Sequence, residues 1–339
     1  MQPEMRMLFR KARGSQRLRN RELVRIAVCD LVVLTEQEMK MTLRNLIYYN
    51  DNANQIPLAG IANLNLPYTD VIIGFLVPGS DDFTLVGGGG PNGGAFDDQL
   101  QNNIRILQNA GRRVLISVGG SKFPSSAYQN FAAWEWGMDM LAGQIIKFVN
   151  DYNFDGVDID YEDDAGFGDN QTYDGVTFLS NLTSLLAQNL PSGRNIITHA
   201  PQTPYWDSNS EYAAGGIAPY YQIWQNVGNQ IDWINNQFYN NSGYDAYAAL
   251  KVEKYQAIVG LIGGPQKLLL GAPLTADNIE GYLPLDQMIN DVIAPLTATY
   301  GSQFGGVMGW QFSLDIGGVW GNGIGNAFGE VLAGIPVEA

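Results

Sequence analysis

The stretch FDGVDIDYED, residues 154–163, places five acidic side chains among residues that favour strands. Side chains of a strand alternate between its two faces, so Asp158, Asp160 and Glu162 share one face and the apolar residues between them share the other. Long segments with helical spacing flank the stretch, which favours a central parallel strand over a solvated edge strand. Three neighbouring carboxylates on an inward face raise at least one pKa, and a raised pKa suits a general acid.

Strand-like and helix-like segments alternate along the whole chain. Eight short apolar runs end in polar or glycine residues, at 45–50, 70–78, 112–120, 154–162, 195–201, 232–240, 266–273 and 306–313. Helical spacing occurs at 96–111, 132–153, 177–190, 246–264 and 285–301. This alternation predicts an α/β fold, a single-domain (β/α)8 TIM barrel. An open doubly wound sheet is the alternative, but no G-x-G-x-x-G follows the first strand, and the glycine-rich run 87–94 lacks the P-loop ending.

Charge is distributed unevenly over the 339 residues. The formal net charge of −15 argues against a nucleic-acid partner. Residues 1–26 hold eight basic and two acidic side chains, which leaves 11 basic and 32 acidic residues, a net −21, for the remainder. We therefore expect residues 1–40 to be a poorly ordered extension, or to precede a natural start at Met39 or Met41, and residues 41–339 to form the barrel.

Residues 24–34 could instead be the apolar region of a secretion signal, although Asp30 interrupts them and no small-residue cleavage site follows. These residues leave the localisation of the protein open. Cys29 is the only cysteine, so an intrachain disulfide is excluded. The chain lacks a run of about 18 apolar residues, so we expect no membrane partner.

Catalytic residues of a barrel lie at the carboxyl ends of its strands. Glu162 is nearest that end and is the candidate proton donor, with Asp160 about 6 to 7 Å below it on the same face. Asp155, at the opposite end of the strand, is interpreted as structural. Aligned carboxylates also bind Mg²⁺ or Mn²⁺, but no further ligand set accompanies them, and His199 is the only histidine. We expect no metal and no cofactor.

Four motifs now carry a family resemblance. Asp155-x-x-Asp158-x-Asp160-x-Glu162 resembles the Asp-x-x-Asp-x-Asp-x-Glu signature of glycoside hydrolase family 18, the chitinases and endo-β-N-acetylglucosaminidases. SVGG at 117–120, QFYN at 237–240 and GWQFSLD at 309–315 resemble family motifs at the ends of strands three, six and eight. The resemblance covers roughly residues 43–335 and implies the same (β/α)8 barrel.

The resemblance implies a retaining hydrolase in which the 2-acetamido group of the substrate replaces the enzymatic nucleophile and forms an oxazolinium ion. Glu162 would act as general acid and base. Asp160 would orient the acetamido N–H, and Asp158 would share a proton with Asp160, helped by Ser117. The hydroxyl of Tyr239 would donate to the acetamido oxygen.

Other candidate substrate contacts come from strand ends and the residues just beyond them. Trp310 would lie under the sugar ring, since an indole face suits the C–H side of a pyranose. The remaining candidates are Gln237, Asn240, Tyr49 and Trp206. Asn240 has an alternative role in shaping its loop.

The chain leaves no room for the small α+β domain that many bacterial chitinases insert after the seventh strand, which predicts a shallow cleft and endo cleavage. The expected substrate is β-1,4-linked N-acetylglucosamine, and the expected state is a monomer. Two alternatives stay open: an endo-β-N-acetylglucosaminidase acting on the chitobiose core of N-glycans, and a non-catalytic lectin or inhibitor on the same barrel. Such binding proteins typically lose the acid or the aspartate before it, whereas Glu162 and Asp160 are present here.

Overall fold

The computed structural model describes residues 43–51, 56–88, 96, 98–277 and 279–333. The chain divides into two units, residues 1–42 and residues 43–339. The predicted extension, residues 1–40, lies outside the described residues. All that follows concerns the second unit.

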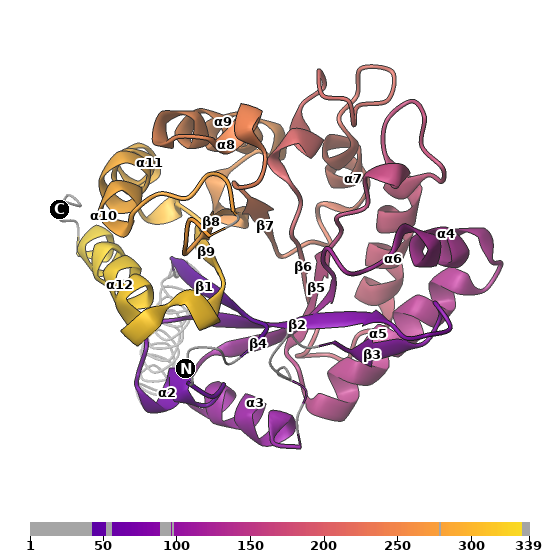
Figure 1. Ribbon diagram of the computed structural model, residues 1–339, viewed down its shortest axis with the longest axis horizontal. Helices are drawn as coiled ribbons and strands as arrows, with labels where there is room; N and C mark the ends of the chain where they lie inside the picture. Colours follow the sequence, from indigo (N-terminus) through magenta and orange to yellow (C-terminus); the bar gives the residue numbers. More distant parts are fainter. Residues whose placement is uncertain (1–42, 52–55, 89–95, 97, 278, 334–339) are drawn as a thin grey trace, which may run out of the picture. The chain divides into compact units, whose positions relative to one another are not determined.

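Within the described residues, eight parallel strands form a closed barrel, which confirms the predicted (β/α)8 fold (Figure 1). In chain order they are β1 (Arg44–Tyr49), β2 (Asp70–Pro78), β4 (Arg113–Gly119), β5 (Gly156–Asp160), β6 (Ile196–His199), β7 (Trp233–Gln237), β8 (Leu268–Pro273) and β9 (Gly306–Trp310). β1 pairs with both β2 and β9, and this pairing closes the circle. A further strand, β3 (Leu85–Gly87), pairs antiparallel with the end of β2.

Helices surround the strands on the outside of the barrel (Figure 1). They are α2 (Gly60–Asn63), α3 (Leu100–Asn109), α4 (Ser125–Ala133), α5 (Gly137–Tyr152), α6 (Gly175–Asn189), α7 (Pro219–Val227), α8 (Ser242–Asp245), α9 (Ala248–Ile262), α10 (Leu285–Gln287), α11 (Ala294–Tyr300) and α12 (Val319–Leu332). The predicted segment 132–153 is interrupted between α4 and α5, and a π-helical turn, η4 (Met288–Ile293), joins α10 to α11. The sequence pattern did not indicate α7 or α12; α12 carries four glycines, which weaken a helical signal.

Alternation along the strands separates two hydrophobic clusters. On β1, Leu46 and Tyr48 belong to an inner cluster with Trp233, whereas Ile47 and Tyr49 belong to the larger cluster between the strands and the helices. Val157 and Ile159 on β5, and Tyr161 just after it, pack in the outer cluster. The acidic residues of β5 consequently face the barrel interior, as their spacing predicts.

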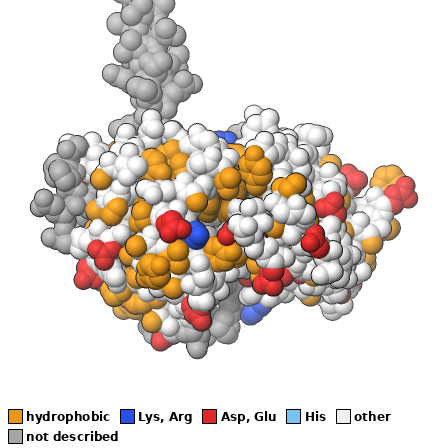
Figure 2. Space-filling model, turned by 90° about the horizontal axis from the view of Figure 1, so that it is seen from above, with side chains coloured by type: hydrophobic (Ala, Val, Ile, Leu, Met, Phe, Trp, Pro, Cys, Tyr) orange, Lys and Arg blue, Asp and Glu red, His pale blue; other side chains and the backbone are white. Residues whose placement is uncertain are grey.

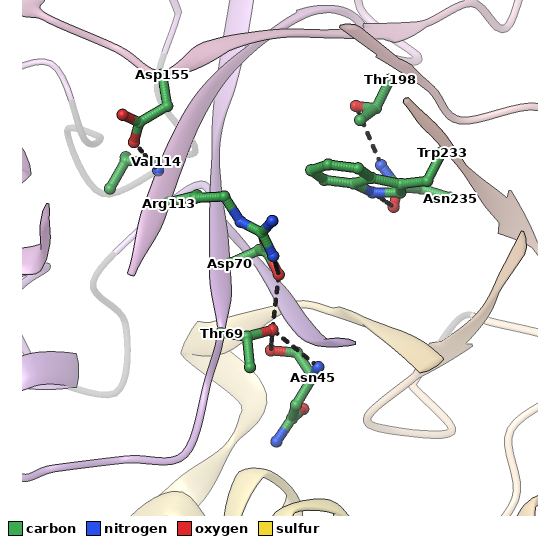
Figure 3. Close-up of polar contacts among 9 residues, drawn as sticks. All are labelled: Asn45, Thr69, Asp70, Arg113, Val114, Asp155, Thr198, Trp233 and Asn235. Carbon is green, nitrogen blue, oxygen red and sulfur yellow. Dashed lines mark hydrogen bonds and ion pairs between the residues drawn. The ribbon is translucent and has the colours of Figure 1, made fainter. Parts of the chain in front are cut away.

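A polar network joins three strands at the amino-terminal end of the barrel (Figure 3). Arg113 on β4 forms an ion pair with Asp70 on β2, with 2.6 Å between Nε and Oδ1. The Thr69 hydroxyl donates to Asp70 Oδ2 at 2.6 Å and accepts a bond of 3.0 Å from the Asn45 backbone N–H on β1. The guanidinium of Arg44 lies 4.0 Å from the ring centroid of Trp233. This end of the barrel is therefore closed by structural contacts, and the opposite end is left for chemistry.

The segment after β8, the lengths of the helices and the surface charge complete the description of the barrel. Only residues 274–284 separate β8 from α10, which is too short for the inserted α+β domain, as predicted. No helix among the described residues is long and apolar enough to cross a membrane. On the face drawn in Figure 2, acidic side chains lie among neutral and hydrophobic ones and basic side chains are few, in keeping with the net charge of −15.

Candidate active site

Asp158 lies at the centre of the barrel interior and is fully buried. Its Oδ2 accepts hydrogen bonds from Tyr48 at 2.7 Å and Ser117 at 2.8 Å. Its Oδ1 accepts from Thr198 at 2.6 Å and Asn235 at 3.0 Å. Burial raises the pKa of Asp158, and the four donated hydrogen bonds oppose that shift. An ionised carboxylate accepts at about four lone-pair sites, so the four donors stabilise the ionised form of Asp158.

Asp160 and Glu162 form a coupled pair above Asp158. Burial, followed by the negative charges of Glu162 and Asp158, raises the pKa of Asp160 well above its ordinary value. Burial also raises the pKa of Glu162, while hydrogen bonds from Gln237 and Asp160 lower it. Nε2 of Gln237 lies 2.9 Å from Asp160 Oδ1 and 3.2 Å from Glu162 Oε1. Asp160 therefore carries the proton that it shares with Glu162.

This arrangement differs from the proton sharing between Asp158 and Asp160 that the resemblance implied. The oxygens of Asp158 already accept bonds from Tyr48, Ser117, Thr198 and Asn235. The hydrogen bond of Asp160 instead goes to Glu162, at the end nearer the mouth. A proton is thus placed next to the residue that the sequence identifies as the general acid.

A cavity opens to solvent beside Glu162. Glu162 and Trp310 line it. The other lining residues are Asn50, Phe75, Val77, Gly88, Gly119, Gly120, Ser121 and Lys122. The ring of Trp310 lies 5.8 Å from that of Phe75 and 5.5 Å from that of Tyr48, measured between centroids. Among the described residues that line the cavity, Glu162 is the only acid. An aromatic wall beside a single carboxyl group suits a ring-shaped, uncharged ligand.

Tyr239 follows β7 and belongs to the inner cluster, with 6% of its surface exposed. Burial raises the pKa of Tyr239 well above its ordinary value, and the charges of Asp160 and Glu162 add to the shift. The phenol is therefore protonated at neutral pH and is a donor. Within the described part of the chain, its hydroxyl makes no hydrogen bond. Its donor capacity is available to a ligand in the barrel mouth.

Several candidate residues do not reach the cavity. Tyr49 packs against Phe312 on the outer side of the barrel, with 5.7 Å between ring centroids. Trp206 is buried in the outer cluster and donates to Asn236 Oδ1 at 2.8 Å. Asn240 has a φ of 62° and pairs with Glu280 through its backbone N–H and its Oδ1, both at 3.1 Å. Asn240 accordingly shapes its loop, the alternative role that the sequence left open.

Three other polar residues have structural positions. Asp155 Oδ2 accepts the Val114 backbone N–H at 2.7 Å at the base of the barrel, as its place in the motif predicts (Figure 3). Asp163 accepts from the Tyr173 hydroxyl at 2.7 Å and begins the loop after β5. His199 is fully buried on the outer side, with Nε2 3.0 Å from the Thr183 hydroxyl. Its burial lowers the pKa of His199 to about 3, so the ring is neutral.

Sequence reasoning missed three residues of the site: Tyr48, Thr198 and Asn235. Figure 3 shows Thr198 and Asn235 pointing into the barrel, where the Trp233 indole donates to Asn235 Oδ1 at 2.9 Å. That bond orients the amide so that its Nδ2 faces Asp158. The alternation of β6 and β7 carried part of the signal: Thr198 pairs with Asp158 across the sheet, and Asn235 shares a face of its strand with Trp233, the lateral partner of Thr198.

Comparison with known proteins places the chain in a family. A family model described as glycosyl hydrolases family 18 matches residues 44–281. The chain belongs to this family. It is a glycoside hydrolase, and the resemblance drawn from its four motifs is confirmed.

Individual relatives agree with this family 18 assignment. The acidic endochitinase of Nicotiana tabacum is 30% identical over 286 residues, which cover 80% of this chain and 88% of the relative. The crystal structure of a GH18 chitinase from Pseudoalteromonas aurantia has a TM-score of 0.75 and 36% identity, over 84% of this chain and 99% of that one. A fungal endo-β-N-acetylglucosaminidase structure covers 83% of this chain and 96% of its own, with a TM-score of 0.65 and 22% identity, and shares the fold.

Proposed function

We propose that this family 18 hydrolase cleaves β-1,4-linked N-acetylglucosamine, as chitin or its oligomers, with retention of configuration and through an oxazolinium intermediate. One observation carries the mechanism. Among the described residues that line the cavity, Glu162 is the only acid, so no second carboxylate faces it across the site. Retaining glycosidases with their own nucleophile hold two carboxyl groups about 5 to 5.5 Å apart across the bond that is cleaved. A substrate that supplies the nucleophile through its acetamido group removes that requirement.

The role that we propose for each side chain follows from the charges around it. The proton that Asp160 carries passes to Glu162, which protonates the glycosidic oxygen and then, as a base, takes a proton from the attacking water. The transfer leaves Asp160 ionised. Asp160 accepts the acetamido N–H. Its negative charge, together with that of the anionic Asp158, offsets the positive charge that develops in the oxazolinium ion. The buried Asp158 has four donors and does not compete for the proton during the reaction.

Tyr239 and Trp310 hold the substrate for this reaction. The Tyr239 hydroxyl donates to the acetamido oxygen, which positions it for attack on the anomeric carbon. The indole of Trp310, which lines the same cavity as Glu162, stacks under the sugar ring. The tobacco relative is named an endochitinase and is 30% identical in sequence, which supports chitin as the substrate and its internal bonds as the bonds that are cleaved.

The test is hydrolysis of N-acetylglucosamine oligomers by the native chain and by Glu162→Gln. We expect native activity, and a loss of about 10²- to 10⁴-fold in kcat for the variant, the usual contribution of a general acid or base. Glu253→Gln is a matched control, since Glu253 is on α9 with 68% of its side chain exposed. A parallel assay with a high-mannose glycopeptide measures endo-β-N-acetylglucosaminidase activity. Cleavage of the glycopeptide alone would replace chitin by the N-glycan core, and sugar binding without cleavage of either substrate would indicate a lectin.

Substrate assistance is tested separately with de-N-acetylated oligomers. These lack the carbonyl oxygen that attacks the anomeric carbon, so we expect no hydrolysis at bonds whose glycone sugar is glucosamine. Cleavage at such bonds at a rate near that of the acetylated oligomer would overturn the mechanism while leaving the hydrolase assignment intact.

A further inference from the structure

The chain segment that carries Tyr239, residues 238–241, is fixed from two sides. On one side the Phe238 N–H donates to Gly271 O at 3.1 Å, and the Asn240 N–H donates to Glu280 O at 3.1 Å. On the other side the segment meets α8 and α9, which follow it in the chain. These two helices contribute a pair of buried ionisable residues, Asp245 and Lys251, that the reaction does not use.

Lys251 on α9 is fully buried, and its ammonium group donates to the backbone carbonyl of Phe238. Burial lowers the pKa of Lys251 to about 8, and the charge of Asp245 opposes that shift. Burying an ammonium group is costly unless it is paired and hydrogen-bonded. The hydrogen-bond partner of this lysine is the carbonyl that immediately precedes Tyr239, and the nearby charge of Asp245 favours the protonated form of the lysine.

Asp245 at the end of α8 holds the other side of the same tyrosine. Its Oδ2 accepts the Asn241 backbone N–H at 3.1 Å. Gly281 packs against both charged groups: a methyl group there would stand 3.0 Å from Asp245 Oδ1 and 3.1 Å from Lys251 Nζ. With a φ of +81°, Gly281 also has a backbone conformation that side chains disfavour. The loop after β8 thus closes over the pair.

We propose that Lys251 and Asp245 are positioning residues that set the direction of the Tyr239 hydroxyl. The inference rests on the role given to Tyr239 in the proposed function. Within the described residues no hydrogen bond fixes that hydroxyl, so its place is determined by the ring and by the backbone on either side of it. Lys251 holds the carbonyl before Tyr239, and Asp245 holds the N–H two residues after it.

This clamp of Lys251 and Asp245 differs from ordinary loop packing because its contacts involve charged groups. Burial raises the pKa of Asp245 to about 7, so the bond from the Asn241 N–H is charge-assisted above that pH, and the Lys251 contact is charge-assisted below about pH 8. Hydrogen bonds to charged groups are shorter and stronger than neutral ones, and they restrict the backbone more closely. A hydroxyl displaced by about 1 Å loses much of its ability to orient a reacting group, at a cost of up to about 10²-fold in rate. A loss of the clamp is therefore expected in kcat and not only in stability.

The test is a double-mutant cycle between Lys251→Met and Tyr239→Phe, with kcat and KM measured on N-acetylglucosamine oligomers. Methionine keeps the length of the lysine side chain and removes its charge and donor. Lys267→Met is a matched control, because Lys267 donates to the backbone carbonyls of Gly228 at 3.3 Å and Ile231 at 2.5 Å, on the stretch that precedes β7 at the other end of the barrel.

We expect Lys251→Met to lower kcat about tenfold with Tyr239 present, and less than twofold in the Tyr239→Phe background. Lys267→Met should lower the Tm without coupling to Tyr239. Equal losses from Lys251→Met in both backgrounds would overturn the inference, as would an unchanged kcat. If Tyr239→Phe by itself leaves kcat unchanged, the role of Tyr239 in the proposed function fails first. These outcomes distinguish failure of the clamp from failure of the mechanism.

A second variant covers the case in which Lys251→Met does not fold, since that substitution removes the positive charge that offsets the buried Asp245. The double substitution Lys251→Met with Asp245→Asn removes both charges together and keeps an acceptor for the Asn241 N–H. Its coupling to Tyr239→Phe should equal or exceed that of Lys251→Met. Additivity in this variant would also overturn the inference.

Discussion

The hydroxyl of Tyr48 donates a 2.7 Å hydrogen bond to Oδ2 of Asp158, across the interior of the barrel. The two residues come from β1 and β5, which are not neighbours in the sheet. The bond therefore links β1, at which the barrel closes, to β5. The chain at β5 carries the acidic column, which consists of Asp158, Asp160 and Glu162. Together with donors from β4, β6 and β7, the Tyr48 bond stabilises the ionised form of Asp158 beneath the two carboxyl groups that share a proton.

Tyr48→Phe removes this donor and keeps the ring. Loss of a hydrogen bond to the charged form raises the pKa of Asp158, so Asp158 becomes protonated at a higher pH. We expect kcat to fall roughly tenfold, the size of one charge-assisted hydrogen bond, and the acid limb of the pH–rate profile to move to higher pH. Kinetics from pH 3 to 9 would measure both effects. A lower kcat with an unmoved acid limb would contradict this role for Tyr48.

The inward orientation of the acidic column was predictable, because its charged residues distinguish one face of the strand from the other. Along β5 a carboxylate at every second position alternates with an apolar residue, and only one assignment of faces buries the apolar residues against helices. On β1 the run NLIYY is uncharged throughout, so alternation separates Tyr48 from Tyr49 without showing which one faces inward. Tyr49 is the residue expected to contact the substrate, whereas Tyr48 is the one that faces the interior.

The hydrogen-bond partners were less predictable, since they depend on lateral register. Asp158 meets donors from four other strands, and their heights are set by pairing across the sheet and not by spacing along the chain. The same holds on β7, where Asn235 faces Asp158 and its neighbour Asn236 binds Trp206 on the outer side. Adjacent identical residues thus have different roles that the sequence alone does not assign.

Gln237→Leu removes the amide that bonds both Asp160 and Glu162. The amide hydrogen bonds of Gln237 favour the ionised forms and oppose the burial that raises the pKa of both Asp160 and Glu162. Without them the pair holds its proton to a higher pH. We expect the alkaline limb of the kcat profile, which reports loss of the acid's proton, to move upward.

Gln144→Leu is the matched control for this substitution. Gln144 on α5 bonds the backbone of residues 83 and 85 at 2.8 Å in each case, away from the cavity. Its loss should reduce stability and leave the pH profile unchanged. A downward shift of the alkaline limb in Gln237→Leu would show that the amide does not act on the ionised forms.

Trp310→Ala removes the indole from the cavity wall. Aromatic contacts of this kind contribute about 0.5–1.5 kcal/mol beyond their buried area, so we expect up to about a tenfold weaker binding of N-acetylglucosamine oligomers. Titration calorimetry with the inactive Glu162→Gln chain would measure the dissociation constant without turnover. Trp206→Phe is the control. Trp206 packs on the outer side of the strands, so its substitution should leave the affinity unchanged. Equal affinities with and without the Trp310 indole would exclude stacking on this residue.

His199 predicts a pH dependence of stability that is independent of the active site. Its pKa is about 3 in the folded chain, because burial disfavours the imidazolium, and about 6.5 in an unfolded chain. Below about pH 6.5 the unfolded state therefore binds one proton more than the folded state, and the free energy of unfolding decreases as the pH falls. The stabilising contribution is complete above the unfolded pKa and is lost progressively between the two values, at up to about 1.4 kcal/mol per pH unit.

His199→Gln keeps a polar partner for the Thr183 hydroxyl and removes the titration. Urea denaturation at a series of pH values between 4.5 and 7.5 would give the free energy of unfolding of both chains. Every other titratable group is common to the two chains, so the difference between their slopes isolates His199. We expect the native chain to lose stability more steeply as the pH falls. Parallel slopes would mean that the buried ring takes up a proton in the folded state as easily as in the unfolded one.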